Sequence, residues 1–318
     1  MAKKYTNTGN KDTRSGFGAG LLEAGRKNQN IVALTADLLG SVKMDAFAKE
    51  FTDRFFQCGI AEANMIGAAA GLAITGKVAF ASSFAEFVTG RVYDQIRQEV
   101  AYGHTNVKVC ASHAGITLGE DGATHQTMED IALMRALPGM VVINPCDYNQ
   151  CKAATLAIAE YNGPVYLRFG RPTMPNFTPE DQVFEIGKAI CMNEGKDVTI
   201  FATGHLVWEA INAAELLEAE GISAEVIDIA TIKPLDVETV VASAKKTGAV
   251  VCAEEHNMCG GLGELIAGVL AANVPTPIEY INGGDKFGQS GTPAQLLNLY
   301  KMDAANIAEA AKRAVARK

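Results

Sequence analysis

Short apolar runs, rich in Val, Ile and Phe, alternate with longer amphipathic stretches in the first half of the chain. The runs are short and apolar throughout, as expected of strands that are covered on both faces. They predict strands at 31–35, 77–82, 106–112, 140–144 and 163–169. The stretches between them predict helices at about 13–27, 61–75, 84–102, 127–136 and 147–161. Because strands and helices alternate, the pattern predicts an α/β fold with a doubly wound parallel sheet.

The segment RPTMPNFTPEDQ at 171–182 interrupts this alternation. It contains three prolines and no periodicity, which is typical of a connection between domains. Beyond it the pattern resumes, with strands predicted at 197–203, 223–229, 248–254 and 277–281, and helices near 207–220, 236–246 and 262–272. We therefore predict two doubly wound α/β domains in series, residues 1–172 and 187–318, joined by a linker at 173–186.

Charge and cysteine usage narrow the possible partners. A net charge of −8 over 318 residues provides no basic stripe for nucleic acid, so a small anionic substrate would need a local basic pocket. The seven cysteines occur without a C-x-x-C pair, which indicates reduced thiols rather than a zinc site. The polar N-terminal segment lacks the apolar core of a signal peptide, and no run approaches the roughly 18 apolar residues of a membrane span. We expect a cytoplasmic protein with no nucleic-acid or membrane partner.

The densest polar cluster is ASHAGITLGEDGATHQTMED, residues 111–130, which follows a predicted strand. It contains His113, Glu120, Asp121 and His125 in a glycine-punctuated loop. In an open parallel sheet, ligands bind at loops that leave the carboxyl ends of strands. Two alternatives stay open at this point: a solvated connection with surface histidines, and a metal site, although the spacing fits no standard zinc pattern.

Two further segments carry candidate chemistry. Glu62 opens a predicted helix that is otherwise rich in Ala, Gly, Ile and Met; it is either a helix-dipole partner or, if buried at an interface, a carboxyl group that can share a proton with a heterocyclic nitrogen. The small-residue run AAAGLA in that helix suits tight packing at an interface. Phe84 and Phe87 lie three residues apart directly after a strand, so they are either core side chains or a shelf for a flat cofactor.

Three motifs in this order resemble the pyrimidine-binding domain of transketolases: GIAEANM at 59–65, SSFAEFV at 82–88 and SHAGITLGEDGATHQ at 112–126, with FGRP at 169–172 behind them. The resemblance implies thiamine diphosphate as cofactor, with Glu62 contacting N1′ of the aminopyrimidine. It places Phe87 against the pyrimidine ring, with Phe84 beside it. The family commonly has a tyrosine three residues after the stacking phenylalanine, and Gly90 stands there, which puts one cofactor hydrogen bond in doubt.

The same resemblance assigns the sugar contacts. His113 and Asp121 would contact hydroxyl groups of the donor and acceptor sugars, and His125 would contact the substrate and assist proton transfer. Arg171, in FGRP, would hold the acceptor phosphate through a bidentate pair. The weaker matches DTRSGFG at 12–18 and TADLLGS at 35–41 add Arg14 and Ser41 as phosphate contacts and Asp37 near the cofactor.

From about residue 187 the chain resembles the C-terminal domain of the same family, including ATGH at 202–205 and EEHNMCGGLGE at 254–264. The Gly-Asp-Gly motif that holds the cofactor's metal in this family is absent, and GEDG at 119–122 and GGDK at 283–286 do not reproduce it. A buried diphosphate needs a cation. We therefore predict that a separate diphosphate-binding chain holds Mg²⁺ or Ca²⁺, in an α2β2 assembly.

The predicted activity is transfer of a two-carbon ketol unit from a ketose phosphate to an aldose phosphate, as in the pentose phosphate pathway. Three alternatives stay open: half of an enzyme like deoxyxylulose-phosphate synthase, a transketolase for a specialised sugar, and a non-catalytic scaffold subunit.

Overall fold

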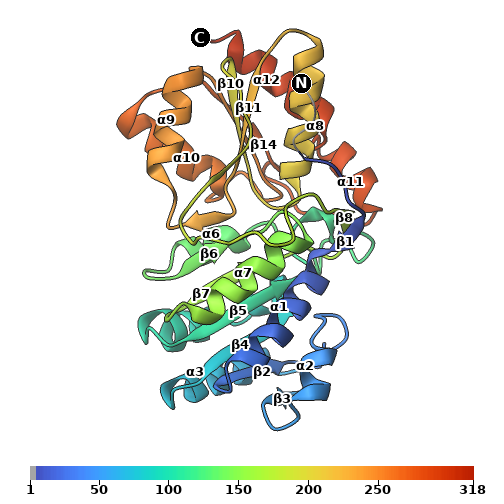
Figure 1. The fold of residues 1–318 in the computed structure, drawn as a ribbon, viewed down its shortest axis with the longest axis vertical. Helices are drawn as coiled ribbons and strands as arrows, with labels where there is room; N and C mark the ends of the chain where they lie inside the picture. Colours follow the sequence, from blue (N-terminus) through green and yellow to red (C-terminus); the bar gives the residue numbers. More distant parts are fainter. Residues whose placement is uncertain (1–4) are drawn as a thin grey trace.

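A seven-stranded sheet forms the centre of the first unit in the computed structural model, which describes residues 5–318 (Figure 1). In spatial order its strands are β12 (Thr231–Lys233), β6 (Val141–Ile143), β7 (Val165–Arg168), β5 (Val107–Ser112), β4 (Val78–Phe84), β2 (Ile31–Thr35) and β3 (Phe55–Gln57). All neighbouring pairs are parallel except β12 with β6. The carboxyl ends of the parallel strands therefore meet at one edge of the sheet.

Helices cover both faces of this sheet, as the doubly wound prediction requires. They are α1 (Thr13–Lys27), α2 (Asp45–Glu50), α3 (Glu62–Ile74), α4 (Ala85–Thr89), α5 (Tyr93–Gln95), a π-helix η1 (Ile96–Tyr102), a 3₁₀ turn η2 (Ile116–Leu118), α6 (Asp130–Arg135) and α7 (Tyr148–Glu160). Asp12 begins α1 by accepting the N–H of Ser15. Gly16 lets α1 approach α7, because a Cβ at this position would lie 2.3 Å from the carbonyl oxygen of Tyr148.

The second unit has a five-stranded sheet in the order β14 (Ile278–Ile281), β13 (Val250–Ala253), β10 (Val198–Ala202), β11 (Ala224–Asp228) and β9 (Ile190–Asn193). Only β9 is antiparallel to its neighbour. The helices of this unit are α8 (Leu206–Ala219), α9 (Val237–Thr247), α10 (Leu262–Asn273), α11 (Pro293–Leu299) and α12 (Ala304–Val315). The helices α8 and α12 pack on one face, and α9 and α10 pack on the other (Figure 1).

The chain crosses between the two units several times. The strand β12 lies in the second half of the sequence but extends the first sheet, and β1 (Asn10–Asp12) pairs with β8 (Thr173–Pro175). Near the N-terminus, Tyr5 packs beside Phe177 and Trp208 against the core of the second unit. The fold class is confirmed, whereas the domain boundaries at 172 and 187 stay a prediction.

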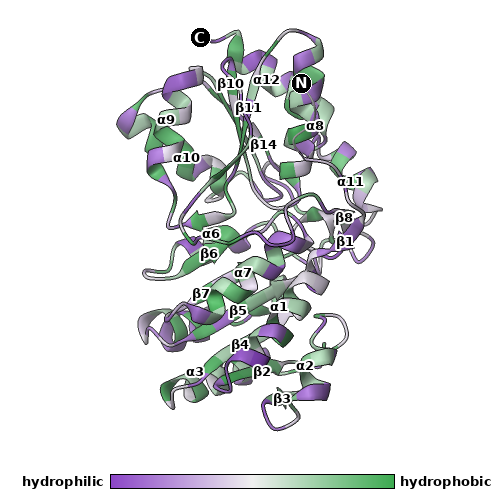
Figure 2. Ribbon diagram, in the orientation of Figure 1, coloured by the Kyte–Doolittle hydropathy of each residue, from purple (hydrophilic) through white to green (hydrophobic). Residues whose placement is uncertain are grey.

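Colouring by hydropathy shows α9 with alternating purple and green along its length, as expected of an amphipathic surface helix (Figure 2). Its buried side is formed by Val240, Ser243, Ala244 and Thr247. None of the helices in residues 5–318 is both long enough and apolar enough to cross a membrane.

The prediction of a single helix at 84–102 is wrong. Phe84 still belongs to β4, and the remainder forms α4, a turn, α5 and the π-helix η1. The helix is interrupted after Gly90, because a glycine is about 1 kcal/mol less favourable in a helix than an alanine. The backbone angles of Val92 are also not helical. The break places Arg91 in the turn rather than on a continuous helix.

Lys108 is a buried basic residue near the amino end of β5, far from the carboxyl ends of the parallel strands. Its Nζ donates to Oδ1 of Asn106 and to the backbone oxygens of Tyr161 and Gly163, each at 2.7 Å. Burial lowers the pKa of Lys108 to about 7 from its ordinary 10.5. The unfolded chain therefore binds more protons than the folded chain between these two values, so the stability of the folded chain rises with pH over that range.

We expect Lys108→Met to lower the free energy of unfolding by about 2 kcal/mol at pH 7, because three acceptors that are at least partly buried lose their donor. The difference in free energy of unfolding between wild type and variant should be larger at about pH 9.5 than at pH 7. The reason is that the wild type alone gains stability as Lys108 loses its proton. Urea denaturation at the two pH values measures both effects. The control Lys77→Met removes an exposed contact to Asn30 and should cost about 0.5 kcal/mol or less. A deficit that is constant or shrinks with rising pH would contradict this account of Lys108.

Candidate active site

The candidate residues come from loops and helix ends at the carboxyl edge of the first sheet. Phe84 ends β4, His113 follows β5, Arg171 follows β7, and Glu62 begins the helix after β3. Because these strands are parallel, their following loops share one edge. The topology therefore gathers residues that are far apart in the sequence.

Aromatic rings form the centre of the site. The rings of Phe84 and Phe87 are stacked with centroids 5.6 Å apart, and the imidazole of His113 stacks on Phe84 at 3.7 Å. His125 meets both phenylalanines edge to face, at 6.3 Å from Phe84 and 5.5 Å from Phe87. The structure thus brings the predicted shelf and both predicted histidines into one cluster.

Glu62 joins this cluster through Arg91. The carboxylate is 4% exposed at the start of α3, and both of its oxygens accept from Nη1 of Arg91 at 3.2 Å. The same guanidinium lies over the ring of Phe87, with Cζ 4.2 Å from the centroid. A planar, nitrogen-bearing group therefore already fits between Glu62 and Phe87. Arg91 was not predicted from the sequence, because its contact with Glu62 forms only where the turn after α4 meets the start of α3.

His113 is held in an unusual conformation. Its φ is 64°, in the left-handed region, and its Nδ1 lies 2.5 Å from Oγ of Ser112. Burial, aided by the neighbouring Arg14, Arg171 and His125, lowers the pKa of His113 to about 3. His113 is therefore neutral at physiological pH. A neutral imidazole has one donor and one acceptor nitrogen, so it can donate a hydrogen bond to a sugar hydroxyl or accept one from it.

Two further arginines, Arg14 and Arg171, add positive charge to the site. Burial lowers the pKa of Arg14, Asp12 opposes this shift, and Arg171 adds to it. Arg14 donates from Nη1 to the carbonyl oxygen of Ser41, and its Nε lies 3.3 Å from Asp12 without a hydrogen bond. Arg171 donates from Nη1 to Leu118 O at 2.9 Å and to the exposed carboxylate of Glu120 at 2.7 Å. These partners leave both guanidiniums able to approach a small anion.

Besides these two arginines, three predicted residues lie outside the aromatic cluster. Asp121 is exposed in the loop between His113 and His125. Asp37 is exposed after β2 with a φ of 61°, and its backbone N–H donates to Gln57 at 2.6 Å. Ser41 reaches Arg14 through its carbonyl group. The roles predicted for these three residues, like those of the other site residues, stay predictions.

Within residues 5–318, the single group of side chains close enough together to hold a cation is Cys191, Glu194 and Glu225 in the second unit. Lys246 pairs with both carboxylates there, at 2.8 Å and 2.7 Å. This group lies on another sheet from the aromatic cluster and carries no role in the site.

Known proteins resemble the chain over almost all of its length. The family described as "Transketolase, pyrimidine binding domain" matches residues 10–176, and "Transketolase, C-terminal domain" matches residues 187–307. A transketolase C-terminal section of Methanocaldococcus jannaschii is 50% identical, covering 94% of this chain and 95% of its own length. The 6-deoxy-6-sulfo-D-fructose transketolase subunit of a Clostridium species is 44% identical, covering 94% of this chain and 92% of its own length. Among solved structures, a split-gene transketolase in the form of an inactive β4 tetramer is 45% identical with a TM-score of 0.89, covering 97% of this chain and 99% of its own.

Proposed function

Because the chain belongs to the transketolase family, we propose that it is one subunit of a split transketolase, completed by a separate diphosphate-binding chain. The complex transfers a two-carbon ketol unit from a ketose phosphate to an aldose phosphate. One observation carries the proposal: Glu62, the phenylalanine pair and the two histidines converge, while the sequence lacks the family's Gly-Asp-Gly motif.

The residues present fit the pyrimidine half of thiamine diphosphate, as the placement of Arg91 between Glu62 and Phe87 indicates. When bound, the cofactor supplies the carbanion chemistry of ketol transfer. Glu62 holds a proton at the ring nitrogen that faces it, and Phe87 and Phe84 bind the flat ring. His125, half-buried beside them, moves protons to and from the sugar hydroxyls.

The surface around Glu62 suits a large partner. Ile60 and Ile74, near the two ends of α3, are 79% and 78% exposed. Between them α3 presents Ala63, Ala68 and Gly71, and a groove of about 420 Å³ runs between this helix and the π-helix η1. An exposed apolar face next to a catalytic carboxylate supports a partner chain seated there, which would bring the Mg²⁺ or Ca²⁺ site. We propose an α2β2 assembly of the two chains.

A specialised sugar is the second candidate, since one relative is named as a 6-deoxy-6-sulfo-D-fructose transketolase subunit. The guanidiniums of Arg14 and Arg171 bind phosphate and sulfonate oxygens by the same chemistry. Ketol-transfer assays of the reconstituted complex with phosphorylated and sulfonated donors separate these substrates. Decarboxylation of pyruvate would instead favour the synthase-like alternative, and inactivity with every donor would favour a scaffold.

We expect Arg171→Ala to raise KM for an aldose phosphate by about 10- to 100-fold while changing kcat less than threefold, because one charge-assisted pair to the phosphate is lost. KM for glycolaldehyde, an acceptor without phosphate, should not change. Arg26→Ala is the control, because Arg26, on α1, also donates to a carboxylate, that of Glu50 on α2, but lies outside the site. An equal rise in KM for glycolaldehyde and for the aldose phosphate would contradict a role of Arg171 in phosphate binding.

We also propose a cytoplasmic location for the protein. All seven cysteines are free thiols, and Cys58, Cys191 and Cys259 among them are at least partly exposed. Unpaired thiols are typical of the reducing cytosol. Fractionation of cells that produce the protein tests this location.

A further inference from the structure

The second unit contacts the loop of the candidate site, and one of these contacts is made by a buried carboxylate. Glu255, two residues after the end of β13, is 3% exposed, and its Oε1 accepts the backbone N–H of Thr117 at 3.1 Å. Thr117 lies in η2, four residues after His113. Gly115, with a φ of 82°, passes so close that a Cβ there would lie 3.0 Å from Cβ of Glu255. The loop backbone is therefore packed directly on this carboxylate.

A second contact holds the other end of the same loop. Gln126, the neighbour of His125, donates from Nε2 to the backbone oxygen of Gln289 in the second unit at 3.1 Å. The same amide donates to Ile116 O at 3.0 Å and to Gly119 O at 3.3 Å, which closes the loop on itself. The loop from His113 to Gln126, which carries the sugar-binding candidates, is thus attached to the second unit near both of its ends.

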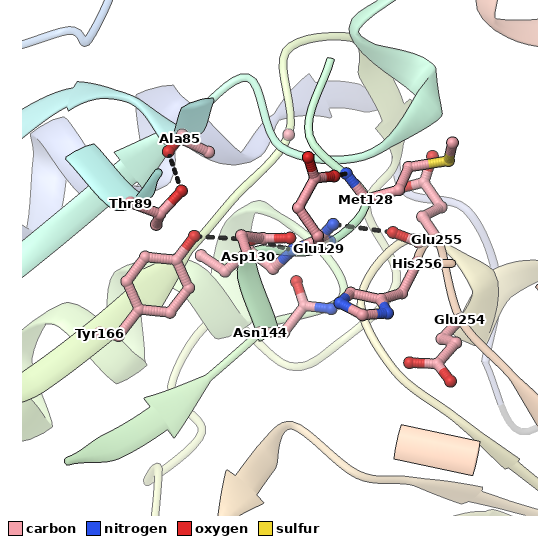
Figure 3. A network of polar contacts seen from close by, with 12 residues as sticks. Ala85, Thr89, Met128, Glu129, Asp130, Asn144, Tyr166, Glu254, Glu255 and His256 are labelled. Atoms are coloured by element: carbon pink, nitrogen blue, oxygen red, sulfur yellow. Dashed lines mark hydrogen bonds and ion pairs between the residues drawn. The ribbon is translucent and has the colours of Figure 1, made fainter. Parts of the chain in front are cut away.

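A buried network fixes Glu255 from behind. Its backbone oxygen accepts from Nη2 of Arg168 at 2.8 Å, and Arg168 donates from Nε to Asp130 at 2.7 Å. The hydroxyl of Tyr166 donates to the same oxygen of Asp130 at 2.6 Å, and Figure 3 shows Asp130 lying between Tyr166 and Glu255. Oε2 of Glu255 lies 3.6 Å from Nδ1 of His205. The network holds the backbone of Glu255, and the carboxylate then accepts from Thr117, so this residue is a rigid support for the loop.

We infer that Glu255 is a positioning residue for sugar binding, which gives the C-terminal unit a part in the reaction. Through Thr117 it sets the path of the loop and hence the places of His113 and His125. The hydrogen bond from Thr117 ties Glu255 to the loop and not to the phenylalanine pair or Glu62, so its removal should affect sugar binding more than cofactor binding. This inference rests on the proposed function and extends it.

The neighbouring Glu254 provides a matched control. It is equally buried, and its two oxygens also accept backbone N–H groups, from Leu262 at 2.7 Å and from Gly263 at 2.8 Å. Both of these groups belong to the start of α10, away from the loop. The test compares Glu255→Leu and Glu255→Gln with Glu254→Leu in the reconstituted complex, measuring kcat, KM for both sugars, Kd for thiamine diphosphate and Tm.

We expect Glu255→Leu to lower kcat/KM for both sugars by about 10- to 100-fold, with Kd for thiamine diphosphate within about threefold of wild type. Glu255→Gln keeps an oxygen that can accept from Thr117 and should restore kcat/KM to within about threefold. Glu254→Leu should lower Tm but leave kcat/KM within about twofold. Equal kcat/KM losses for the two leucine variants, or no loss for Glu255→Leu, would overturn the inference.

Hydrogen exchange of the wild-type complex provides a test that needs neither a folded variant nor an active enzyme. The amide of Thr117 should be protected for minutes or longer, because its acceptor is buried. Exchange as fast as that of an open loop would overturn the inference even if every leucine variant failed to fold. Absence of ketol transfer in the wild-type complex, with Thr117 protected, would instead refute the proposed function alone.

Discussion

Glu62→Gln is expected to reduce ketol transfer by the assembled complex by about two to four orders of magnitude, the range that general acid–base groups contribute. A glutamine in this place cannot exchange a proton with a ring nitrogen. The fold should survive, because the amide is almost the same size as the carboxyl and its oxygen can still accept from Arg91. The substitution therefore separates proton transfer from packing.

Turnover is measured at saturating cofactor and sugars, with Tm and the elution volume of the complex as checks on folding. Glu225→Gln is the matched control, since Glu225 is also a buried carboxylate with one cationic partner, Lys246, at 2.7 Å. It lies in the sheet of the second unit, so turnover should stay within about twofold of wild type. Near-normal turnover of Glu62→Gln would remove the basis of the proposed mechanism.

Hydrophobic periodicity predicted the regular parts of the fold. The helix at 13–27 and the strand at 31–35 have the bounds that the pattern indicated, because local residues decide them. The strands β1, β3, β8, β9 and β12 were not predicted. Each has at most four residues, and β12 is held by pairing with β6, nearly ninety positions earlier in the sequence. The helix α12 was also missed, although Asp303 as N-cap was a usable signal.

In the candidate site, too, local sequence predicted some residues and missed those placed by long-range contacts. Its motifs are contiguous, so the glutamate, the phenylalanine pair and the two histidines could be named from the sequence. Arg91 and Glu255 could not be named from the sequence, because their contacts depend on where elements from separate parts of the chain meet. Arg91 reaches Glu62 from the turn after a broken helix, and Glu255 reaches Thr117 across 138 positions of sequence. Both act through tertiary placement, which periodicity does not encode.

The isolated chain is expected to bind thiamine diphosphate with Mg²⁺ at least about 100-fold more weakly than the complex with a diphosphate-binding chain, and to transfer no ketol unit. One reason is the missing metal motif, since the diphosphate charge would stay unneutralised. The other is Arg91, whose guanidinium contacts both Glu62 and Phe87 and must give up these contacts when a ring binds there. Each reason predicts weak binding by this chain alone.

Calorimetry on the isolated chain, on the candidate partner and on their mixture measures the effect, and the ketol-transfer assay follows the same three samples. A partner whose Gly-Asp-Gly aspartate is changed to alanine is the control; it should assemble with this chain but restore neither tight binding nor activity, because the cation is lost. Arg91→Gln in the isolated chain should improve binding by only severalfold, because the diphosphate still lacks its metal. Tight binding of thiamine diphosphate by the isolated wild-type chain would show that the cofactor site is complete within one polypeptide, and the split-enzyme proposal would then fail.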